Sequence, residues 1–261
     1  MQLLSYETLL LEELDDGLLE VTLSRPKQLN ALNMVTVDEL FHLINELKNP
    51  HTQKYYAIII RGAERAFSSG GDLNEFLTIY EEHDSVIENY IAKFQRLTKS
   101  WYELPIPTIA SLHGAVAGGG ASLALASDIR IAADNTKIQF IFSRIGLIPD
   151  MGAHYLLPRL VGEANSLEWL YTGRPIQSEE ALTKGLIHKI VPLEELQRQT
   201  IEYAGIYKHG SKEVYKHIKQ LIKTNHLSLD QILNQETVIQ TDRFKNHEFK
   251  DKIQNFFTKK K

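Results

Sequence analysis

Cysteine is absent from the 261-residue sequence, which excludes disulfide bonds, thiol nucleophiles and cysteine-based metal sites. No apolar run approaches the roughly 20 residues that a membrane-spanning helix needs. The N-terminal stretch carries acidic side chains, whereas a secretion signal has a basic segment followed by an apolar core. These absences predict a soluble, cytoplasmic protein without a membrane partner.

Basic residues are not in excess, because 29 Lys+Arg stand against 33 Asp+Glu and give a formal net charge of −4. A chain without an overall positive field is not expected to bind nucleic acid. The sequence also has no His-x-x-x-His pair and no nucleophile-elbow pattern around a serine. We therefore expect neither a metal site nor a serine hydrolase.

Hydrophobic residues make up 43% of the chain, enough for a sizeable core, and short strand-like runs alternate with helical periods. The pattern predicts an α/β core over residues 1–192 and a helical region over 193–261, with Pro192 near the boundary. The expected elements of the core include a hairpin at 6–11 and 18–23 with its turn at 15–17, helices at 34–47, 73–80, 85–103 and 121–127, and strands at 56–61, 108–112, 128–132 and 137–141. Asn33 is expected to cap the helix at 34–47, and Ser178 a short helix at 178–184. In the helical region, Ile253, Phe256 and Phe257 predict an apolar stripe on the last helix.

Two glycine turns each follow a strand and open a helix, one at Gly70-Gly71 and the other at Gly118–Gly120. Backbone N–H groups at a helix start have no carbonyl partner within the helix and lie at the positive end of its dipole. Such a turn can hold a phosphate, a carboxylate or a charge that develops during a reaction. No Lys-Ser/Thr pair follows the glycines as in a P-loop, and the dinucleotide fingerprint is incomplete. The turns therefore indicate either an oxyanion hole with one N–H from each turn or simply two tight turns in an α/β core.

Four segments carry a resemblance to a known family: RGAERAFSSGGDLNEF, IPTIASLHGAVAGGGASLALASDIRIAADNTKIQF, IGLIPDMGAHYLLPRLVG and TGRPIQSEEALTKGLIHKIVP. In register from about residue 6 to the C-terminus, the chain resembles the crotonase superfamily, the enoyl-CoA hydratase/isomerase group. The resemblance implies a crotonase-like spiral of repeated ββα units and a helical C-terminal region that mediates trimerisation. It also implies an acyl-CoA thioester substrate, no cofactor beyond the coenzyme A of that substrate, and a homotrimer or a dimer of trimers.

The resemblance assigns the two oxyanion donors to the N–H groups of Gly71 and Gly119. Hydratases of this family carry two glutamates, at the positions where this chain has Ser122 and Phe142. Water addition by the usual pair of carboxylates is therefore not expected. Asp150 stands where related phenylacetate-type isomerases place a base and dehalogenases a nucleophile. We assign it the catalytic role; the alternative is an N-cap of the helix that follows.

The remaining candidates surround this centre. The family implies recognition of coenzyme A by the backbone around Lys27, Leu29, Ala66 and Ser68, and contact with substrate at Gly70, Asp72, Leu73, Ser122, Phe142 and His154. Asp72 is also expected to cap the helix at 73–80. His154, four residues after Asp150, would tune that acid if both shared a helical face, or else be structural. Arg25, Lys27 and Arg65 are candidate phosphate contacts or solvated surface charges.

These assignments favour an enoyl-CoA isomerase that shifts a 3-enoyl thioester to the conjugated 2-enoyl form. Asp150 would move the proton, while Gly71 and Gly119 would hold the enolate oxygen. The enzymatic alternatives are a hydratase of unusual architecture, a thioester hydrolase and a dehalogenase with Asp150 as nucleophile. Outside catalysis, the alternative is a family member that only binds acyl-CoA or RNA.

Overall fold

A computed structural model describes the chain except for residues 1–4, 16, 50–53, 225–226 and 259–261. Its contacts divide the chain into two compact units, Met1–Lys212 and Glu213–Lys261. The sequence-based boundary after residue 192 falls within the first unit, because a helix at Leu196–Gly205 packs on the sheet of that unit.

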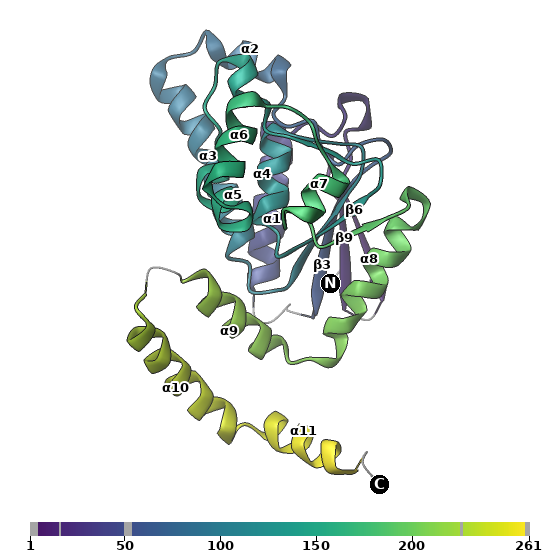
Figure 1. The fold of residues 1–261 in the computed structure, drawn as a ribbon, viewed down its shortest axis with the longest axis vertical. Coiled ribbons are helices and arrows are strands. Elements are labelled where there is room, and N and C mark those ends of the chain that lie inside the picture. The colour runs from purple at the N-terminus through teal and green to yellow at the C-terminus, as the bar shows by residue number, and fades with distance from the viewer. Residues whose placement is uncertain (1–4, 16, 50–53, 225–226, 259–261) are drawn as a thin grey trace. The chain divides into compact units, whose positions relative to one another are not determined.

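A six-stranded sheet forms the centre of the first unit (Figure 1), in the order β1-β2-β3-β4-β6-β9. The strands are β1 (Leu9–Asp15), β2 (Leu18–Leu23), β3 (Ala57–Gly62), β4 (Thr108–Leu112), β6 (Ile129–Ala133) and β9 (Lys189–Val191). β1 and β2 form the predicted antiparallel hairpin, and each further neighbour pair is parallel. The carboxyl ends of β2, β3, β4, β6 and β9 therefore meet at one edge of the sheet.

Both faces of this sheet are covered, as the apolar run of β3 predicts. Ile58 and Ile60 pack in a large core with α1 (Met34–Lys48), α3 (Asp84–Tyr102) and α4 (Gly118–Ala126). Ile59, which points to the other face, packs in a smaller core with residues of α8 (Leu196–Gly205). Figure 1 shows α8 on the opposite side of the strands from α1 and α4. Alternation along one strand thus supplies two separate cores.

A second sheet of three strands, β5 (Ala115–Ala117), β7 (Lys137–Gln139) and β8 (Ile176–Gln177), leads into α4. β5 and β7 are parallel, and β7 and β8 antiparallel. The sequence placed the glycines before a helix at 121–127, but α4 begins at Gly118, so the three glycines form its first turn. Close packing overrides the poor helix propensity of glycine here, since a Cβ on Gly120 would lie 2.6 Å from Cβ of Ser68.

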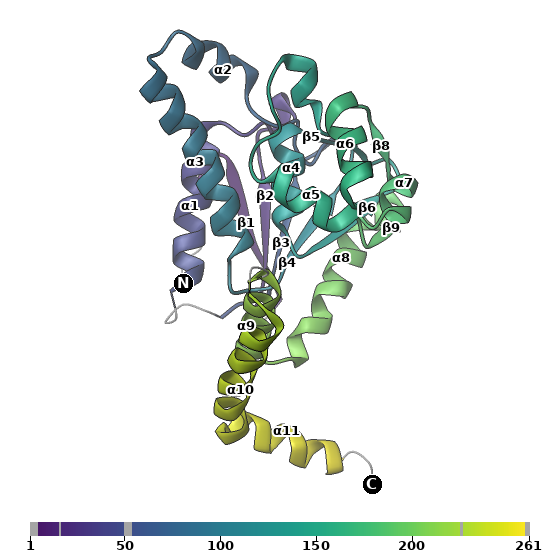
Figure 2. The same cartoon turned by 60° about the vertical axis from the view of Figure 1, so that its left-hand side comes forward.

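The other elements of the first unit are short helices that connect and cover the sheets (Figure 2): α2 (Leu73–Tyr80), α5 (Ala153–Val161), α6 (Glu163–Thr172), α7 (Ser178–Thr183) and the 3-10 turns η1 (Pro26–Gln28), η2 (Ile141–Ile145), η3 (Leu193–Glu195) and η4 (Ile206–His209). The predicted N-cap of α1 is confirmed, because Asn33 accepts a hydrogen bond from Thr36 N at 3.0 Å. Ser178 is not the expected cap of α7. Its hydroxyl donates to the Asp134 carbonyl at 2.7 Å, and the N-cap position is Gln177.

The second unit contains most of α9 (Lys212–Lys223), together with α10 (Leu229–Lys245) and α11 (His247–Thr258). Ser228 and Gln231 form a capping box at the start of α10. The apolar stripe expected for the last helix included Phe256 and Phe257, whose side chains lie outside the described residues. Within the described residues, no helix combines the length and apolar character needed to cross a membrane.

Candidate functional site

Three loops at the carboxyl ends of β2, β3 and β4 are joined by backbone hydrogen bonds. The segment after β3 forms parallel bridges on both sides, Gly71 with Leu32 and Ser68 with Val116. Leu32 N donates to Gly70 O at 2.7 Å, and Ala117 N donates to Ser68 O at 2.8 Å. Open α/β sheets bind their ligands beyond the carboxyl ends of the strands. The joined loops therefore mark this edge as the candidate site.

This pairing brings the two predicted donors together. A Cβ built on Gly119 would lie 3.9 Å from the Gly71 nitrogen. Across the described part of the chain, no hydrogen bond uses the Gly71 N–H, and Gly119 is the second residue of α4, so its N–H has no carbonyl one turn earlier. Two unsatisfied N–H groups side by side, one at the positive end of a helix dipole, can bind an oxyanion.

Neither donor position has room for a side chain. A Cβ on Gly71 would lie 2.3 Å from Cζ of Phe76, and a Cβ on Gly119 would lie 2.9 Å from Sδ of Met151. Beside them, a Cβ on Gly70 would lie 3.3 Å from the Gly119 nitrogen, and Gly70 has φ +100°, which favours glycine. A side chain at either donor position would therefore have to displace Phe76 or Met151, and one at Gly70 would also require a strained backbone.

Asp72 fixes the chain directly after Gly71. Its carboxylate accepts Asn74 N at 3.1 Å as the predicted N-cap of α2, and Nη2 of Arg25 at 2.8 Å. Burial alone would raise the pKa of Asp72, but the hydrogen bonds from Arg25 and Asn74 outweigh it and hold the pKa below its usual range. Arg25 also donates to Ala31 O at 2.7 Å, so its guanidinium holds these loops together.

Asp150 lies in the turn that leads to α5, and its neighbour Met151 is the residue whose sulfur packs against Gly119. The N-cap of α5 is Gly152, and no side chain caps the helix. The alternative reading of Asp150 as a helix cap is therefore wrong. No other described residue forms a hydrogen bond with the Asp150 carboxylate, which leaves it available for chemistry.

Burial raises the pKa of Asp150 to about 6, although its own backbone N–H lowers it slightly. A carboxylate with this pKa is a usable base near neutral pH. His154 does not tune it: His154 is exposed, and Asp150 precedes the helix, so the two do not share a helical face. The raised pKa follows from the half-buried position of the carboxyl itself.

The two positions that lack glutamate have structural roles. The Ser122 hydroxyl, from within α4, donates to the Asp150 carbonyl oxygen at 3.1 Å. Phe142 is buried in the large core. The Ser122 side chain thus supports the loop that carries Asp150, and the Phe142 side chain is apolar, so neither position supplies a carboxylate.

A protein-family model described as enoyl-CoA hydratase/isomerase matches residues 13–261. The chain belongs to the enoyl-CoA hydratase/isomerase family. A Rhodobacter capsulatus protein named "Probable enoyl-CoA hydratase" is 31% identical over 98% of this chain and 97% of its own length. The trans-2-decenoyl-[acyl-carrier-protein] isomerase of Streptococcus mutans is 32% identical over 82% of this chain and 81% of its own length.

Solved structures of family members have the same fold. An enoyl-CoA hydratase from Polaromonas sp. JS666 superposes with a TM-score of 0.91 at 26% identity, covering 96% of this chain and 97% of its own. An enoyl-CoA hydratase from Bacillus anthracis gives 0.90 at 25% identity, with 97% of each chain covered. The predicted α/β crotonase fold with a helical C-terminal region is confirmed.

The backbone groups predicted to recognise coenzyme A already form some hydrogen bonds within the protein. Leu29 O accepts Ser69 N at 2.9 Å, and Ala66 O accepts Nδ2 of Asn30 at 2.7 Å. The N–H and C=O of Ser68 both pair with β5. Each carbonyl keeps a second lone pair. Lys27 and Arg65 are exposed, as is Leu73 at the start of α2, so these side chains extend into solvent beside the donor loops.

Sequence reasoning missed two polar residues beside Gly71. The Tyr90 hydroxyl, from α3, donates to Oε2 of Glu75 in α2 at 2.6 Å. Both Glu75 oxygens also accept the Met34 N–H, each at 3.1 Å. Glu75 and Tyr90 look like ordinary members of two helical periods in the sequence, and only the packing of α2 on α3 brings them together.

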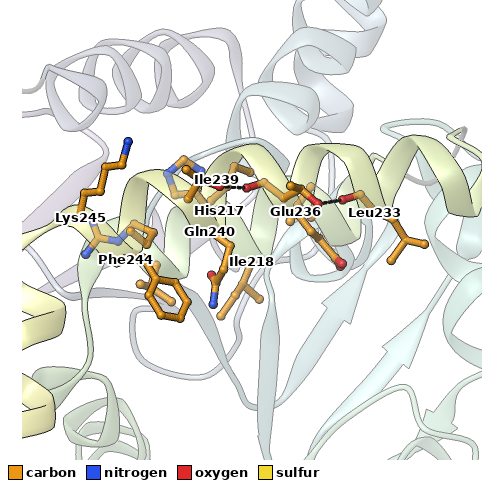
Figure 3. Close-up of a pocket in the computed structure, with 13 residues that line it drawn as sticks. His217, Ile218, Leu233, Glu236, Ile239, Gln240, Phe244 and Lys245 are labelled. Carbon is orange, nitrogen blue, oxygen red and sulfur yellow. Dashed lines mark hydrogen bonds between the residues drawn. The ribbon is translucent and has the colours of Figure 1, made fainter.

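A cavity of about 920 Å³ lies elsewhere, among residues of the second unit. It is bordered by α9 and α10, with Ile218, Leu233 and Phe244 as apolar walls and His217 and Glu236 as polar ones (Figure 3). None of the predicted site residues lines it.

Proposed function

We propose that this family member is an enoyl thioester isomerase that moves a double bond from the 3,4 to the 2,3 position. Asp150 removes a proton from the α carbon, and the N–H groups of Gly71 and Gly119 bind the oxygen of the resulting enolate. Protonated Asp150 then returns the proton to the γ carbon. No atom is gained or lost, so one carboxylate suffices for the reaction.

The observation that carries this proposal is the state of the Asp150 carboxylate. Asp72 is committed to Arg25, and Glu75 to Met34 and Tyr90. Asp150 has no such partner among the described residues, and its pKa is raised to about 6. A group that must take and return a proton needs a pKa near the working pH and an uncommitted oxygen. The oxyanion donors stabilise the negative charge that appears between the two transfers, each by about 3 kcal/mol.

Hydration is the competing activity, and the names of several relatives favour it. Adding water requires a group that holds and deprotonates the water as well as an acid for the α carbon. Ser122 is bound to the Asp150 carbonyl and Phe142 is apolar. The site thus offers one proton-transfer group where hydration uses two, which favours isomerisation.

The carrier of the acyl group has two candidates. Coenzyme A is the first, because it names the family. Acyl-carrier protein is the second, since the Streptococcus mutans relative is named for a decenoyl group on that carrier. Both present the same pantetheine thioester to the oxyanion donors. Comparing kcat/KM for a 3-decenoyl group on each carrier decides between them: a value at least tenfold higher identifies the preferred one.

The decisive experiment measures deuterium incorporation at the α and γ carbons of 3-decenoyl-CoA in deuterated water, together with formation of the 2-enoyl product by ultraviolet absorbance. Asp150→Asn should lose exchange and turnover by about 100-fold or more. Asp38→Asn, the same change at an exposed carboxylate of α1, is the matched control and should retain both. Exchange that proceeds equally fast in Asp150→Asn would refute the assignment of the base. Formation of a 3-hydroxy product, of free acid or of no product by the native protein would favour hydratase, hydrolase or purely binding functions.

We also propose self-association through the second unit as a trimer or a dimer of trimers. The cavity between α9 and α10 and the exposed Ile222, Val238 and Phe244 support it, because apolar surface of this kind is rarely left in contact with water. Light scattering of the native chain and of Val238→Glu tests it. A monomeric native chain would contradict this proposal without affecting the catalytic one.

A further inference from the structure

The Glu75 carboxylate links three helices beside the Gly71 donor. Met34, whose N–H it accepts with both oxygens at 3.1 Å, is the first residue of α1, and Tyr90, whose hydroxyl it accepts at 2.6 Å, belongs to α3. Glu75 itself lies in the first turn of α2. Hydrogen bonds to an ionised acceptor are shorter and roughly twice as strong as neutral ones. Glu75 is therefore a firm junction between the three helices.

This junction closes a ring of contacts around Gly71. Leu32 pairs with the Gly71 segment on both sides: Leu32 N donates to Gly70 O, and Asp72 N donates to Leu32 O at 3.0 Å. Two residues after Leu32 comes Met34, which Glu75 holds. The chain thus runs from Gly71 through α2 to Glu75, across to Met34 and back through Leu32 to Gly71. A shift of Glu75 would move the parallel bridge between Leu32 and Gly71, and with it the Gly71 N–H.

Aromatic packing connects the same residues to Gly71. The Phe76 ring fills the space where a Gly71 side chain would stand, and the Tyr90 ring meets it edge-on with ring centroids 6.2 Å apart. Tyr90 in turn packs on Phe94 at 5.0 Å. Tyr90 therefore supports Gly71 twice, through Glu75 by a hydrogen bond and through Phe76 by ring contact.

The Tyr90 hydroxyl is a permanent donor. Burial and the hydrogen bond to Glu75 raise the pKa of Tyr90, and the charges of Asp72 and Asp150 add to the effect. Its proton is thus committed to Glu75 throughout the pH range in which Asp150 titrates. A hydroxyl held in this way orients its partner and takes no part in acid–base exchange.

We propose that Tyr90 and Glu75 are a positioning pair for the oxyanion hole: the Tyr90 hydroxyl orients the Glu75 carboxylate, which holds the Leu32–Met34 backbone and thereby aims the Gly71 N–H at the thioester oxygen. This inference rests on the proposed use of Gly71 as a donor. It assigns neither residue a contact with the reacting atoms.

The test measures the polarisation of a bound thioester. Hexanoyl-CoA labelled with ¹³C at the thioester carbonyl cannot isomerise, and its carbonyl stretching frequency falls when hydrogen-bond donors polarise it. Difference infrared spectra of the bound label are compared for the native chain, Tyr90→Phe and Glu75→Gln. Tyr55→Phe is the matched control, because Tyr55 is a buried tyrosine that precedes β3, whereas the donor loops follow that strand.

In Tyr90→Phe and Glu75→Gln, the carbonyl frequency should return towards its value in solution, and kcat for 3-decenoyl-CoA should fall about tenfold with KM changed less than threefold. The double variant should lose no more than the larger single loss, since the two residues act as one device. Tyr55→Phe should keep both the native frequency and kcat. Because Glu75→Gln leaves the buried Tyr90 side chain unchanged, it carries the test if Tyr90→Phe fails to fold.

An unchanged carbonyl frequency in folded Tyr90→Phe and Glu75→Gln would overturn the inference, and so would a rise in KM alone or a loss of stability alone. The result is separable from the proposed reaction. If the native chain polarises the carbonyl but forms no isomerised product, the isomerase proposal fails. The effect of the Tyr90 and Glu75 substitutions on the carbonyl frequency still tests the positioning pair. If the native chain isomerises its substrate and the carbonyl frequency is the same in Tyr90→Phe, only this inference fails.

Discussion

The Ser122 hydroxyl donates to the backbone carbonyl of Asp150 at 3.1 Å. The family resemblance places at Ser122 one of the two glutamates that hydratases carry, and the Ser122 side chain of this chain instead supports the loop that bears Asp150. Because Ser122 belongs to α4, the helix that supplies the Gly119 N–H also holds Asp150. One helix thereby fixes the proposed base relative to one of the proposed oxyanion donors.

The pH dependence of turnover should report Asp150. Its pKa is raised to about 6, and the base must be ionised to take a proton. We expect kcat/KM to be level above pH 7 and to fall about tenfold per pH unit below 6. Initial rates between pH 4.5 and 8 check this expectation. His154→Gln should leave the midpoint unchanged, whereas a midpoint near 4 would mean that the carboxyl is not buried in solution.

Asp150→Asn should increase stability while reducing activity. The pKa is about 6 in the folded chain and 3.8 for an unperturbed carboxyl, so the folded state binds the proton more tightly and becomes less stable as the pH rises through this window. For this half-buried group the cost above pH 6 is about 2 kcal/mol. Asparagine carries no charge and avoids this cost.

Urea unfolding of the native chain and Asp150→Asn at pH 7.5 and pH 4 measures the difference. The variant should be more stable by about 1–2 kcal/mol at pH 7.5, and the advantage should disappear near pH 4, where Asp150 is neutral. Equal stability of the two proteins at both pH values would show that Asp150 is fully solvated.

Gly119→Ala should damage the oxyanion hole. The new Cβ would lie 2.9 Å from Sδ of Met151 and 3.9 Å from the Gly71 nitrogen, next to the second donor. Met151 can move its sulfur to make room, so the main effect is the methyl group that crowds the space beside the Gly71 N–H. We expect kcat/KM to fall by about 100-fold, with a loss of roughly 1 kcal/mol in unfolding free energy.

Gly205→Ala is the control for that substitution. Gly205 lies at the end of α8 with φ −56°, and a Cβ there would meet nothing within 4 Å. This variant should be fully active and equally or slightly more stable, because alanine restricts the unfolded chain. Steady-state rates and thermal unfolding of both variants make the comparison. If both glycines tolerate alanine, the donors are not confined as the structure describes.

The sequence by itself determined the local features of this protein. Strand-like runs on either side of a turn predicted the β1–β2 hairpin, helical periodicity predicted α1 with Asn33 as its cap, and the limits of α2 and β4 were predicted to the residue. Each depends on residues a few positions apart, whose backbone preferences are visible in the sequence. The two glycine turns were visible in the sequence itself, and the family resemblance assigned the donors within them and the candidate base at Asp150.

Only the tertiary structure decided what surrounds these motifs. The start of α4 at Gly118 depends on how closely Ser68 packs against Gly120, and the raised pKa of Asp150 depends on burial. The junction at Glu75 joins residues 41 and 15 positions away, and α2 and α3 carry no local mark of it. Contacts between distant residues and the loss of water around a charge arise when the elements pack together. A sequence pattern determines which face of a helix is apolar. The side chains of other elements that pack against this face are determined only by the tertiary structure.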